Sequence, residues 1–248
     1  MKRVLVLLFG VLCYVVFLGT FLYQIGFVAN QWVPKSIDDG AVIPPLHAAG
    51  IDVVLLSLFA IQHTIMARLV FKRWWTTIVP QPIERSVYVL LASLLLLLMN
   101  WQWKPLPEIV WHVDSTIGRL VLNATTCVGW GLVLYATFLI NHFDLFGLRQ
   151  VWLDYCGREY TPVRFKETVL YQWVRHPLML GFIIAFWATP DMTQGHLLFA
   201  VVTTAYILVG IQIEERTLMA IHGDEYRWYQ ERVSMILPMR PRPRRSGK

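Results

Sequence analysis

The sequence predicts an all-α polytopic membrane protein, and three observations support that prediction. Hydrophobic residues make up 56% of the 248 residues and charged residues only 15%, whereas a soluble domain of this length carries about a quarter charged residues. The apolar residues fall into continuous blocks near the length of a membrane span instead of amphipathic stripes. Basic residues gather in alternate connections between these blocks, which is typical of a multi-pass protein.

Clusters of glycine, proline and charge separate six apolar segments. We expect membrane helices at 4–28, 46–67, 86–101, 118–140, 177–189 and 196–213. The first segment resembles a signal peptide but is too long for one, so we interpret it as a retained helix. Interfacial belts are expected from the tryptophans at segment ends: Trp74, Trp75, Trp101, Trp103 and Trp111. The whole chain, 1–248, is therefore expected to form one integral membrane domain.

The distribution of lysine and arginine predicts the orientation of these helices. Lys2 and Arg3 open the chain, and the second and fourth loops and the tail after Pro238 are rich in basic residues. The intervening loops hold only Lys35 and Lys104. This alternation predicts six crossings with both termini in the cytoplasm, and we expect the bilayer to be a bacterial inner membrane. The net charge of +6 therefore reflects topology and does not indicate a nucleic-acid partner.

The fifth segment is unusually short for a membrane helix. Residues 177–189 would form about 20 Å of helix, against a hydrocarbon core of about 30 Å. Pro177 suits the first helical position, and the turn TPDMTQG leads directly into the sixth segment. If this turn lies at the outer face, Arg175 and His176 lie just below the cytoplasmic surface, in a polar pocket that both water and lipid reach.

Polar residues flank both ends of this helical hairpin. Arg175 and His176 precede it, and Glu214 and Glu215 follow it, so we expect the hairpin to bring them to one membrane face. Arginine binds carboxylates bidentately, and a helix N-terminus adds partial positive charge. The group would therefore suit a ligand with a carboxylate and a ribose. The same residues could also be charges that only solvate the ends of spans, and their spacing does not decide between the two interpretations.

Two longer motifs favour the ligand-binding interpretation. YQWVRHPLMLG and EERTLMAIHGDEYRWYQERVSMILP together resemble the signature of integral-membrane S-adenosylmethionine methyltransferases, such as isoprenylcysteine carboxyl methyltransferases and phospholipid N-methyltransferases. The shared pattern is Arg-His-Pro, a glycine four residues after the proline, a short hairpin, Glu-Glu and a closing proline. Met179 departs from this pattern, because isoprenylcysteine enzymes often carry tyrosine at that position.

Upstream motifs narrow the resemblance. QHTIMARLVFKRWW and INHFDLFGLRQVWL resemble the methanethiol S-methyltransferases, a family of the NnrU-type group. The resemblance implies methyl transfer from S-adenosylmethionine to a small thiol, with methanethiol giving dimethyl sulfide and S-adenosylhomocysteine as the second product. It implies no metal, an active site that faces the cytoplasm, and a cofactor-binding part at about 141–238. The cofactor-binding residues that it implies are Tyr171, Arg175, His176, Pro177, Gly181, Glu214, Glu215 and Tyr226.

The resemblance also assigns parts of the cofactor to these residues. It places the methionine carboxylate and amine near Arg175 and His176 and the ribose near Glu215. Glu214 and Arg216 would hold the exit helix.

The thiol needs a group that activates it, because thiolate and not thiol is the nucleophile. Histidine has a suitable pKa for a general base. We therefore predict four catalytic residues near the cytoplasmic ends of the second and fourth segments: His63, Asn141, His142 and Arg149. His63 could instead form a hydrogen bond between helices, and His142 could take part in a helix C-cap.

Other functions fit parts of the sequence. An NADPH-dependent enone reductase of the steroid-reductase type shares the Arg-His-Pro hairpin, although the pair Glu214 and Glu215 favours a methyltransferase. A methyltransferase of the same fold could act on another acceptor, and a scaffold or transporter would use these charges only for topology. The three cysteines share no spacing typical of a disulfide framework or a zinc site, so we expect no metal.

Overall fold

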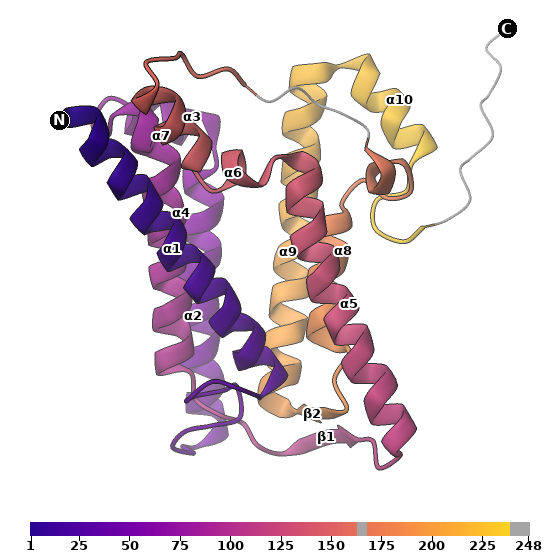
Figure 1. Cartoon of the computed structure of the whole chain (residues 1–248). Coiled ribbons are helices and arrows are strands. Elements are labelled where there is room, and N and C mark those ends of the chain that lie inside the picture. The colour runs from indigo at the N-terminus through magenta and orange to yellow at the C-terminus, as the bar shows by residue number, and fades with distance from the viewer. Residues whose placement is uncertain (163–167, 239–248) are drawn as a thin grey trace, which may run out of the picture. The chain divides into compact units, whose positions relative to one another are not determined.

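The computed structural model describes residues 1–162 and 168–238. The elements, in chain order (Figure 1), are α1 (Lys2–Ala29), α2 (Pro45–Met66), α3 (Leu69–Trp75), α4 (Gln81–Gln102), β1 (Ile109–His112), α5 (Thr116–Ile140), α6 (His142–Leu145), α7 (Leu148–Tyr155), η1 (Val169–Gln172), α8 (Pro177–Trp187), β2 (Asp191–Thr193), α9 (Gln194–His222) and α10 (Asp224–Arg232). Within the described ranges, five helices are long and apolar enough to cross a membrane: α1, α2, α4, α5 and α9. The chain is therefore an all-α polytopic membrane protein, as predicted. The basic tail after Pro238 lies outside the described residues.

The predicted apolar segments match parts of the observed helices to within a few residues, and the last helix extends beyond its apolar segment. The sixth apolar segment was predicted for 196–213, and α9 continues from it to His222. The apolar run does end near 213, but the residues that follow it include glutamate, arginine, leucine and methionine, which are good helix formers. Glu214 and Glu215 therefore lie on a continuous helix and not on a segment beyond it.

The chain folds into two compact units. Unit 1 comprises Met1–Val113, Asn141–Arg164 and Asp191–Val202, and unit 2 comprises Asp114–Ile140, Phe165–Pro190 and Thr203–Lys248. The first turns of α9 belong to unit 1, and the rest of this helix belongs to unit 2. The predicted cofactor-binding part, 141–238, thus draws on both units.

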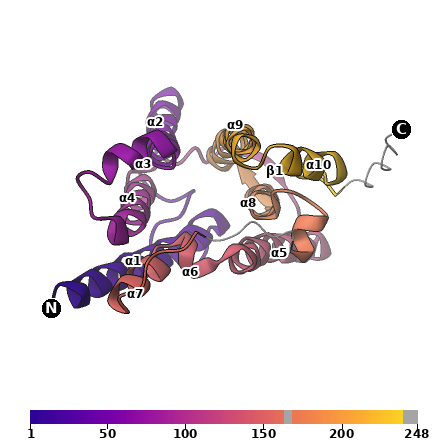
Figure 2. The same cartoon turned by 90° about the horizontal axis from the view of Figure 1, so that it is seen from above.

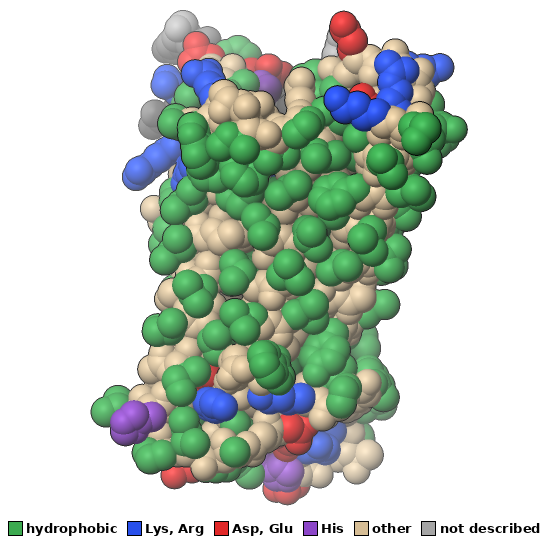
Figure 3. Space-filling model, turned by 90° about the vertical axis from the view of Figure 1, so that its left-hand side faces the viewer, with side chains coloured by type: hydrophobic (Ala, Val, Ile, Leu, Met, Phe, Trp, Pro, Cys, Tyr) green, Lys and Arg blue, Asp and Glu red, His purple; other side chains and the backbone are tan. Residues whose placement is uncertain are grey.

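In unit 1, α4 packs along α1, α2 and α7, and α1 also packs along α7 (Figures 1 and 2). Aromatic side chains contribute to this packing, since the ring of Phe17 on α1 stacks on Phe146 with centroids 3.7 Å apart. Figure 3 shows one face of the molecule, on which hydrophobic side chains cover the middle and charged side chains gather at the two ends. This distribution suits helices whose middle lies in hydrocarbon.

A small antiparallel sheet, absent from our prediction, joins β1 and β2 in unit 1. Its register pairs Ile109 with Thr193, Trp111 with Met192 and His112 with Asp191, with an irregularity between Ile109 and Trp111. The two strands are far apart in the sequence and each is only three or four residues long. Local hydrophobic patterns therefore do not reveal them.

The end of α4 corrects one prediction about tryptophan. We placed Trp101 and Trp103 together in an interfacial belt, but only Trp101 is exposed, at 70%, and Trp103 is fully buried. The ring of Trp103 packs edge-on against Phe27 and Phe199. Trp103 is the C-cap of α4, so its backbone no longer follows the helix. The resulting bend of the chain turns the indole inward.

In unit 2, α5 and α8 lie side by side (Figures 1 and 2) and approach very closely. A Cβ atom on Gly129 would lie 2.7 Å from the backbone nitrogen of Ala185, and one on Gly181 would lie 2.8 Å from the carbonyl oxygen of Gly129. Glycine at both positions lets the two backbones touch, as in other membrane helix pairs. α8 has 11 residues, so it is about 16 Å long and even shorter than predicted.

Candidate functional site

The segment before α8 is held by the segment after α10. Val174 forms a parallel bridge with Ser234. The backbone N–H of Arg175 donates to the carbonyl of Ser234 at 2.8 Å, and that of His176 donates to the carbonyl of Met235 at 3.1 Å. Pro177 then starts α8 at a position where its missing N–H has no helical partner. These backbone hydrogen bonds fix the direction in which the side chains of Arg175 and His176 leave the chain.

Both side chains reach the same carboxylate on α9. Arg175 Nε donates to Glu215 Oε1 at 2.7 Å, and His176 Nε2 donates to the same oxygen at 3.0 Å. The three side chains are only 10%, 6% and 14% exposed for Arg175, His176 and Glu215. The prediction that the hairpin brings residues 175, 176 and 215 to one place is confirmed. Charge-assisted hydrogen bonds of this kind are stronger than neutral ones, and burial strengthens them further.

Two residues that the sequence analysis missed complete this cluster. Gln230 Nε2 donates to Glu215 Oε2 at 2.8 Å, so both oxygens of Glu215 accept hydrogen bonds. Arg175 Nη1 donates to the carbonyls of Gln230 and Val233 at 3.1 Å and 2.5 Å. A polar residue on α10 that faces α9 could have indicated Gln230, but the carbonyl of Val233 leaves no signal in the sequence. We call Arg175, His176, Glu215 and Gln230 the arginine cluster.

Glu214 differs from its neighbour Glu215 in exposure and in partners. Adjacent helical residues point about 100° apart, so only one of the two can face Arg175. The side chain of Glu214 is 51% exposed, and His176 Nδ1 lies 3.8 Å from its Oε2. Among the described residues, Glu214 accepts no hydrogen bond, since this ion-pair contact is longer than one. Its carboxylate therefore retains the capacity to accept hydrogen bonds from a ligand.

Two buried tyrosines of α10 pack beneath the arginine cluster. Tyr226 and Tyr229 are 2% and 1% exposed, with ring centroids 5.7 Å apart. The hydroxyl of Tyr229 donates to the carbonyl of Tyr171 at 2.6 Å and so ties α10 to η1. Burial and the charge of Glu215 raise the pKa of Tyr226, while burial and the charge of Glu214 raise the pKa of Tyr171. Both phenols therefore remain protonated at neutral pH.

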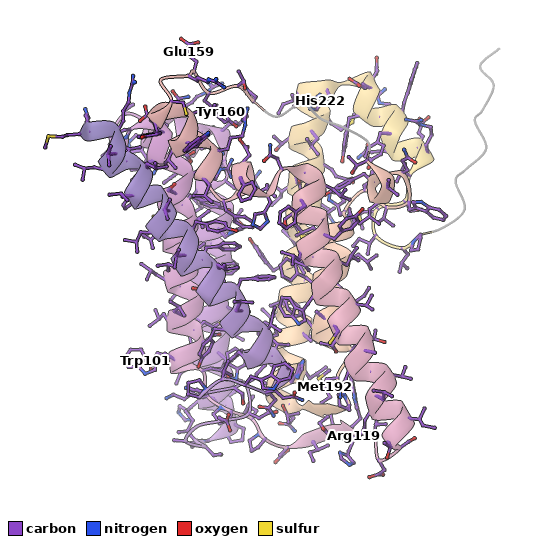
Figure 4. All side chains as sticks on the ribbon, viewed as in Figure 1. Trp101, Arg119, Glu159, Tyr160, Met192 and His222 are labelled. Atoms are coloured by element: carbon purple, nitrogen blue, oxygen red, sulfur yellow. The ribbon has the colours of Figure 1, made fainter. Side chains whose placement is uncertain are left out.

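The structure brings together most of the predicted cofactor-binding residues. Five of them converge near the C-terminal end of α9, where the chain passes into α10: Arg175, His176, Glu214, Glu215 and Tyr226. Figure 4 labels His222, the last residue of α9. Gly181 instead faces α5, and its close contact with Gly129 gives it a role in helix packing. Its predicted role in cofactor binding stays a prediction, as does that of Pro177.

The four predicted catalytic residues lie in unit 1, whereas the arginine cluster lies in unit 2. The hydroxyl of Tyr88 lies 3.0 Å from each ring nitrogen of His63. The ring of Phe59 stacks on the same histidine at 5.2 Å between centroids. His63 thus makes the hydrogen bond between α2 and α4 that we considered as its alternative role.

The other three predicted catalytic residues surround α6. His142 is 4% exposed and its Nε2 is hydrogen-bonded to the hydroxyl of Tyr14 at 2.8 Å. Burial lowers the pKa of His142, so the imidazole is neutral at pH 7. Asn141 caps α6 by accepting the N–H of Asp144 at 3.2 Å, and Arg149 Nη1 donates to Asp144 Oδ1 at 2.9 Å. Asn141 and Arg149 thus have clear structural roles, while their catalytic roles stay predictions.

The polar groups of the arginine cluster and of the adjacent Glu214 fit S-adenosylmethionine. Arg175 uses Nε and Nη1 within the cluster, and no residue among 1–162 and 168–238 is hydrogen-bonded to its Nη2. A guanidinium edge is suited to the methionine carboxylate, and the exposed carboxylate of Glu214 is suited to hydroxyl or ammonium donors. Across the same described residues, no group of three or more His, Cys, Asp or Glu side chains could hold a metal ion.

Several known proteins that are about half identical to this chain are named methanethiol S-methyltransferase. A methanethiol S-methyltransferase of Mycobacterium tuberculosis is 54% identical over 96% of this chain and 98% of its own length. Another from Crocosphaera subtropica is 51% identical over 96% of this chain and 93% of its own. Methanethiol S-methyltransferase 1 of Bradyrhizobium diazoefficiens is 55% identical over 94% of this chain and 82% of its own.

No family model matches the chain, and no solved structure matches it. The full-length similarity at more than half identical residues nevertheless agrees with the motifs around Arg175 and Glu215 and with the geometry that joins them. The chain belongs to the methanethiol S-methyltransferase family.

Proposed function

We propose that this protein transfers a methyl group from S-adenosylmethionine to methanethiol and releases dimethyl sulfide and S-adenosylhomocysteine. One observation carries this proposal: three relatives that are each more than half identical along more than nine-tenths of the chain are named for that reaction. The arginine cluster and the adjacent Glu214 support it, because together they offer a guanidinium and an exposed carboxylate at the end of a short hairpin. The names of all three relatives describe methyl transfer, which favours it over enone reduction.

When bound, S-adenosylmethionine supplies a methyl group on a sulfonium sulfur, which a thiolate can displace by in-line attack. Arg175 would bind the methionine carboxylate through its remaining Nη2 edge, and His176 would support the orientation of Glu215. Tyr171 and Tyr226 would bound the ligand with neutral phenols. Pro177 and Gly181 would place the start of α8 against α5.

The two glutamates would exchange the roles that the family resemblance implies for them. Both oxygens of Glu215 already accept hydrogen bonds from Arg175, His176 and Gln230. Glu215 would therefore hold the guanidinium in place, and Glu214, which is half exposed, would accept hydrogen bonds from the ribose hydroxyls. This assignment requires that Glu214→Gln weaken cofactor binding while the protein remains as stable as the wild type.

The activation of the thiol would fall to a neutral histidine. His142 is the better candidate, because burial lowers its pKa and keeps the ring able to accept a proton at neutral pH. His63 is the second candidate, with Tyr88 as its hydroxyl partner. Asn141 and Arg149 would position the turn that carries His142. Under this proposal His142→Gln lowers the rate most at low pH, where little free thiolate exists, and less at high pH.

We further propose six crossings, with α8 as the short one, both termini and the arginine cluster on the cytoplasmic side, and a bacterial inner membrane as the location. Support comes from Lys2, Arg3 and the basic residues around α3 on one side, against Lys35 and Lys104 on the other. A C-terminal green fluorescent protein fusion should fluoresce in bacterial cells, and a C-terminal alkaline phosphatase fusion should be inactive. An active phosphatase fusion would contradict this topology.

A headspace gas-chromatography assay tests the proposed reaction. Purified protein with methanethiol and S-adenosylmethionine should release dimethyl sulfide in step with S-adenosylhomocysteine. Omission of either substrate is the control. Formation of S-adenosylhomocysteine without dimethyl sulfide, together with methylation of a different acceptor, would keep the methyltransferase and overturn the substrate. Absence of both products from a folded protein would overturn the reaction.

A further inference from the structure

A polar pocket of about 720 Å³ is lined only by residues of unit 1. None of these residues belongs to the arginine cluster. Its lining comes from the start of α1, from α3, from the first turn of α4 and from α7 with the loop that follows, where Figure 4 labels Glu159 and Tyr160. Five of the lining side chains are cationic: Arg3, Lys72, Arg73, Arg85 and Arg158. We call this the basic pocket.

Within the described residues, the cations of the basic pocket form no ion pair with the carboxylates around them. Among the residues that the structure describes, none of the five lies within 4.0 Å of a carboxylate oxygen. Arg149, close by on α7, shows the contrast, because it pairs with Asp144 at 2.9 Å. The Nε atom of Arg85 is buried and has no hydrogen-bond partner within the described ranges. A buried donor without a partner is costly, so an external acceptor would stabilise this pocket.

Lys72 lies on the short helix α3, outside the spans, and is affected by neighbouring charges of both signs. Burial and the charge of Arg85 lower the pKa of Lys72, and the carboxylates of Glu84 and Asp144 offset only part of this shift. Arg3 reaches across from α1 to the loop after α7, where a Cβ on Gly157 would lie 2.9 Å from its Nη1. Like charges drawn together from separate elements repel one another unless an anion lies between them.

The pocket also carries hydrogen-bond acceptors, which a bare phosphate would not use. Glu84, Asp154 and Glu159 contribute carboxylates to the lining. Gln150 is 8% exposed, and its Nε2 donates to the carbonyl of Asp144 at 3.1 Å. Its buried Oε1 has no partner among the described residues. Cations together with acceptors suit a ligand that has both a phosphate and hydroxyl groups.

The surroundings of the pocket suit a position at the level of lipid headgroups. α3 contributes Lys72 and Arg73 to the lining, while the apolar side chains of Val70 and Trp74 on this helix and of Ile78 just after it are exposed. A short helix with exposed tryptophan and aliphatic side chains next to lysine and arginine is typical of the membrane interface. Basic pockets at this level are suited to anionic lipids.

We propose that the basic pocket binds the headgroup of an anionic glycerophospholipid, with the phosphate among the cations and glycerol hydroxyls on the carboxylates. Phosphatidylglycerol has this chemistry, and free glycerol phosphate shares it. The proposal does not rest on the methyltransferase reaction, because no residue of the arginine cluster lines the pocket.

Native mass spectrometry of the purified full chain tests this site. The protein in mild detergent is mixed with equal amounts of phosphatidylglycerol and phosphatidylcholine, and bound lipid is counted. The wild type should retain about tenfold more phosphatidylglycerol. The double variant Arg73→Gln/Arg158→Gln should lose that preference. Both side chains are exposed, so the variant should fold, and its melting temperature checks this. Arg227→Gln, an exposed cation of α10, is the matched control and should retain the preference.

Thermal unfolding in the presence of glycerol 3-phosphate separates the two sources of this chemistry. A rise in the melting temperature, absent in the double variant, would indicate that the free phosphate ester also binds. No rise, with phosphatidylglycerol still retained, would indicate that the lipid is the ligand. Equal retention of the two lipids by the wild type would overturn the proposal. So would a double variant that retains phosphatidylglycerol as well as the Arg227→Gln control does.

Discussion

In the arginine cluster, the side chains of Arg175 and His176 both donate hydrogen bonds to the carboxylate of Glu215. In the basic pocket of unit 1, by contrast, none of the five cations has a carboxylate of the described residues within ion-pairing distance. The arginine cluster is therefore preorganised before any ligand binds, and it offers a ligand only the polar groups that are not already hydrogen-bonded within it, such as Nη2 of Arg175. The basic pocket, by our proposal, takes an anion from outside. A cluster of charges in a membrane protein can thus be paired internally or left open for a ligand, and the hydrogen-bond and ion-pair partners of each charge distinguish the two cases.

The largest expected effect comes from Glu215→Gln, which removes the charge that the arginine cluster is built around. Arg175 is only 10% exposed, so it would keep a neutral acceptor but lose its ion pair. Breaking a buried pair from one side costs about 3 kcal/mol or more, and we expect methyl transfer to fall about 100-fold. Dimethyl sulfide release and the melting temperature measure the two effects. Glu231→Gln, an exposed carboxylate of α10, is the control. A rate within about twofold of the wild type would remove the distinction between the two charged regions.

The next effect concerns the helix packing that positions the arginine cluster. Gly129→Ala would place its Cβ 2.7 Å from the backbone nitrogen of Ala185, whereas Gly131→Ala, on the same helix, would meet no atom within 4 Å. We expect Gly129→Ala to destabilise the protein by about 1–3 kcal/mol, and Gly131→Ala to have little effect or to stabilise it slightly. Thermal unfolding in detergent compares the pair. Equal melting temperatures for the two variants would show that α8 does not depend on this close approach.

A smaller effect should separate the two glutamates. Glu214→Gln removes an exposed acceptor without breaking a hydrogen bond among the described residues. We expect the KM for S-adenosylmethionine to rise about tenfold, with the melting temperature unchanged. Titration of the cofactor at saturating methanethiol measures it. If Glu214→Gln leaves KM unchanged while Glu215→Gln raises it and keeps kcat, the ribose contact belongs to Glu215 and the exchange of roles proposed above is wrong.

The smallest effect is a dependence of stability on pH in unit 1. Burial lowers the pKa of His142 in the folded protein below its ordinary value of about 6.5. The folded state then binds fewer protons than the unfolded state, so stability is complete above about pH 6.5 and falls as the pH drops toward the lowered pKa. His142→Gln should show a shallower loss of melting temperature between about pH 7.5 and about pH 5.5. Identical slopes for variant and wild type would mean that His142 is not buried as a neutral ring.

The membrane helices could be predicted from the sequence because continuous hydrophobic blocks of span length are typical of membrane helices and rare in soluble domains. The same signal does not locate the end of α9, which continues past the apolar run that ends near 213, because hydropathy marks an apolar stretch and not the end of a helix. Trp101 and Trp103 look alike in sequence, yet one is exposed and the other is buried by a bend at the helix end. β1 and β2 pair across a long sequence separation that local patterns do not reveal.

Some features of the candidate site could likewise be predicted from the sequence, and others could not. The convergence of Arg175, His176 and Glu215 could be predicted, since a helical hairpin returns its two ends to one face. The backbone bridge from Val174 to Ser234 could not be predicted, because main-chain carbonyls carry no residue-specific signal. The division of labour between adjacent glutamates depends on a rotation of about 100° per residue, and fixing it from sequence would require the exact register of α9. The basic pocket was visible only as basic loops, which topology alone could explain.

Calorimetric titration of S-adenosylhomocysteine into the purified protein tests the central claim most directly, namely that the arginine cluster of unit 2 holds the cofactor. The account predicts that the wild type and Arg227→Gln bind it equally well, and that Arg175→Lys binds it at least about tenfold more weakly, because an ammonium does not reproduce the guanidinium fork. Equal affinity in all three proteins, each shown to be folded by its melting temperature, would contradict the claim.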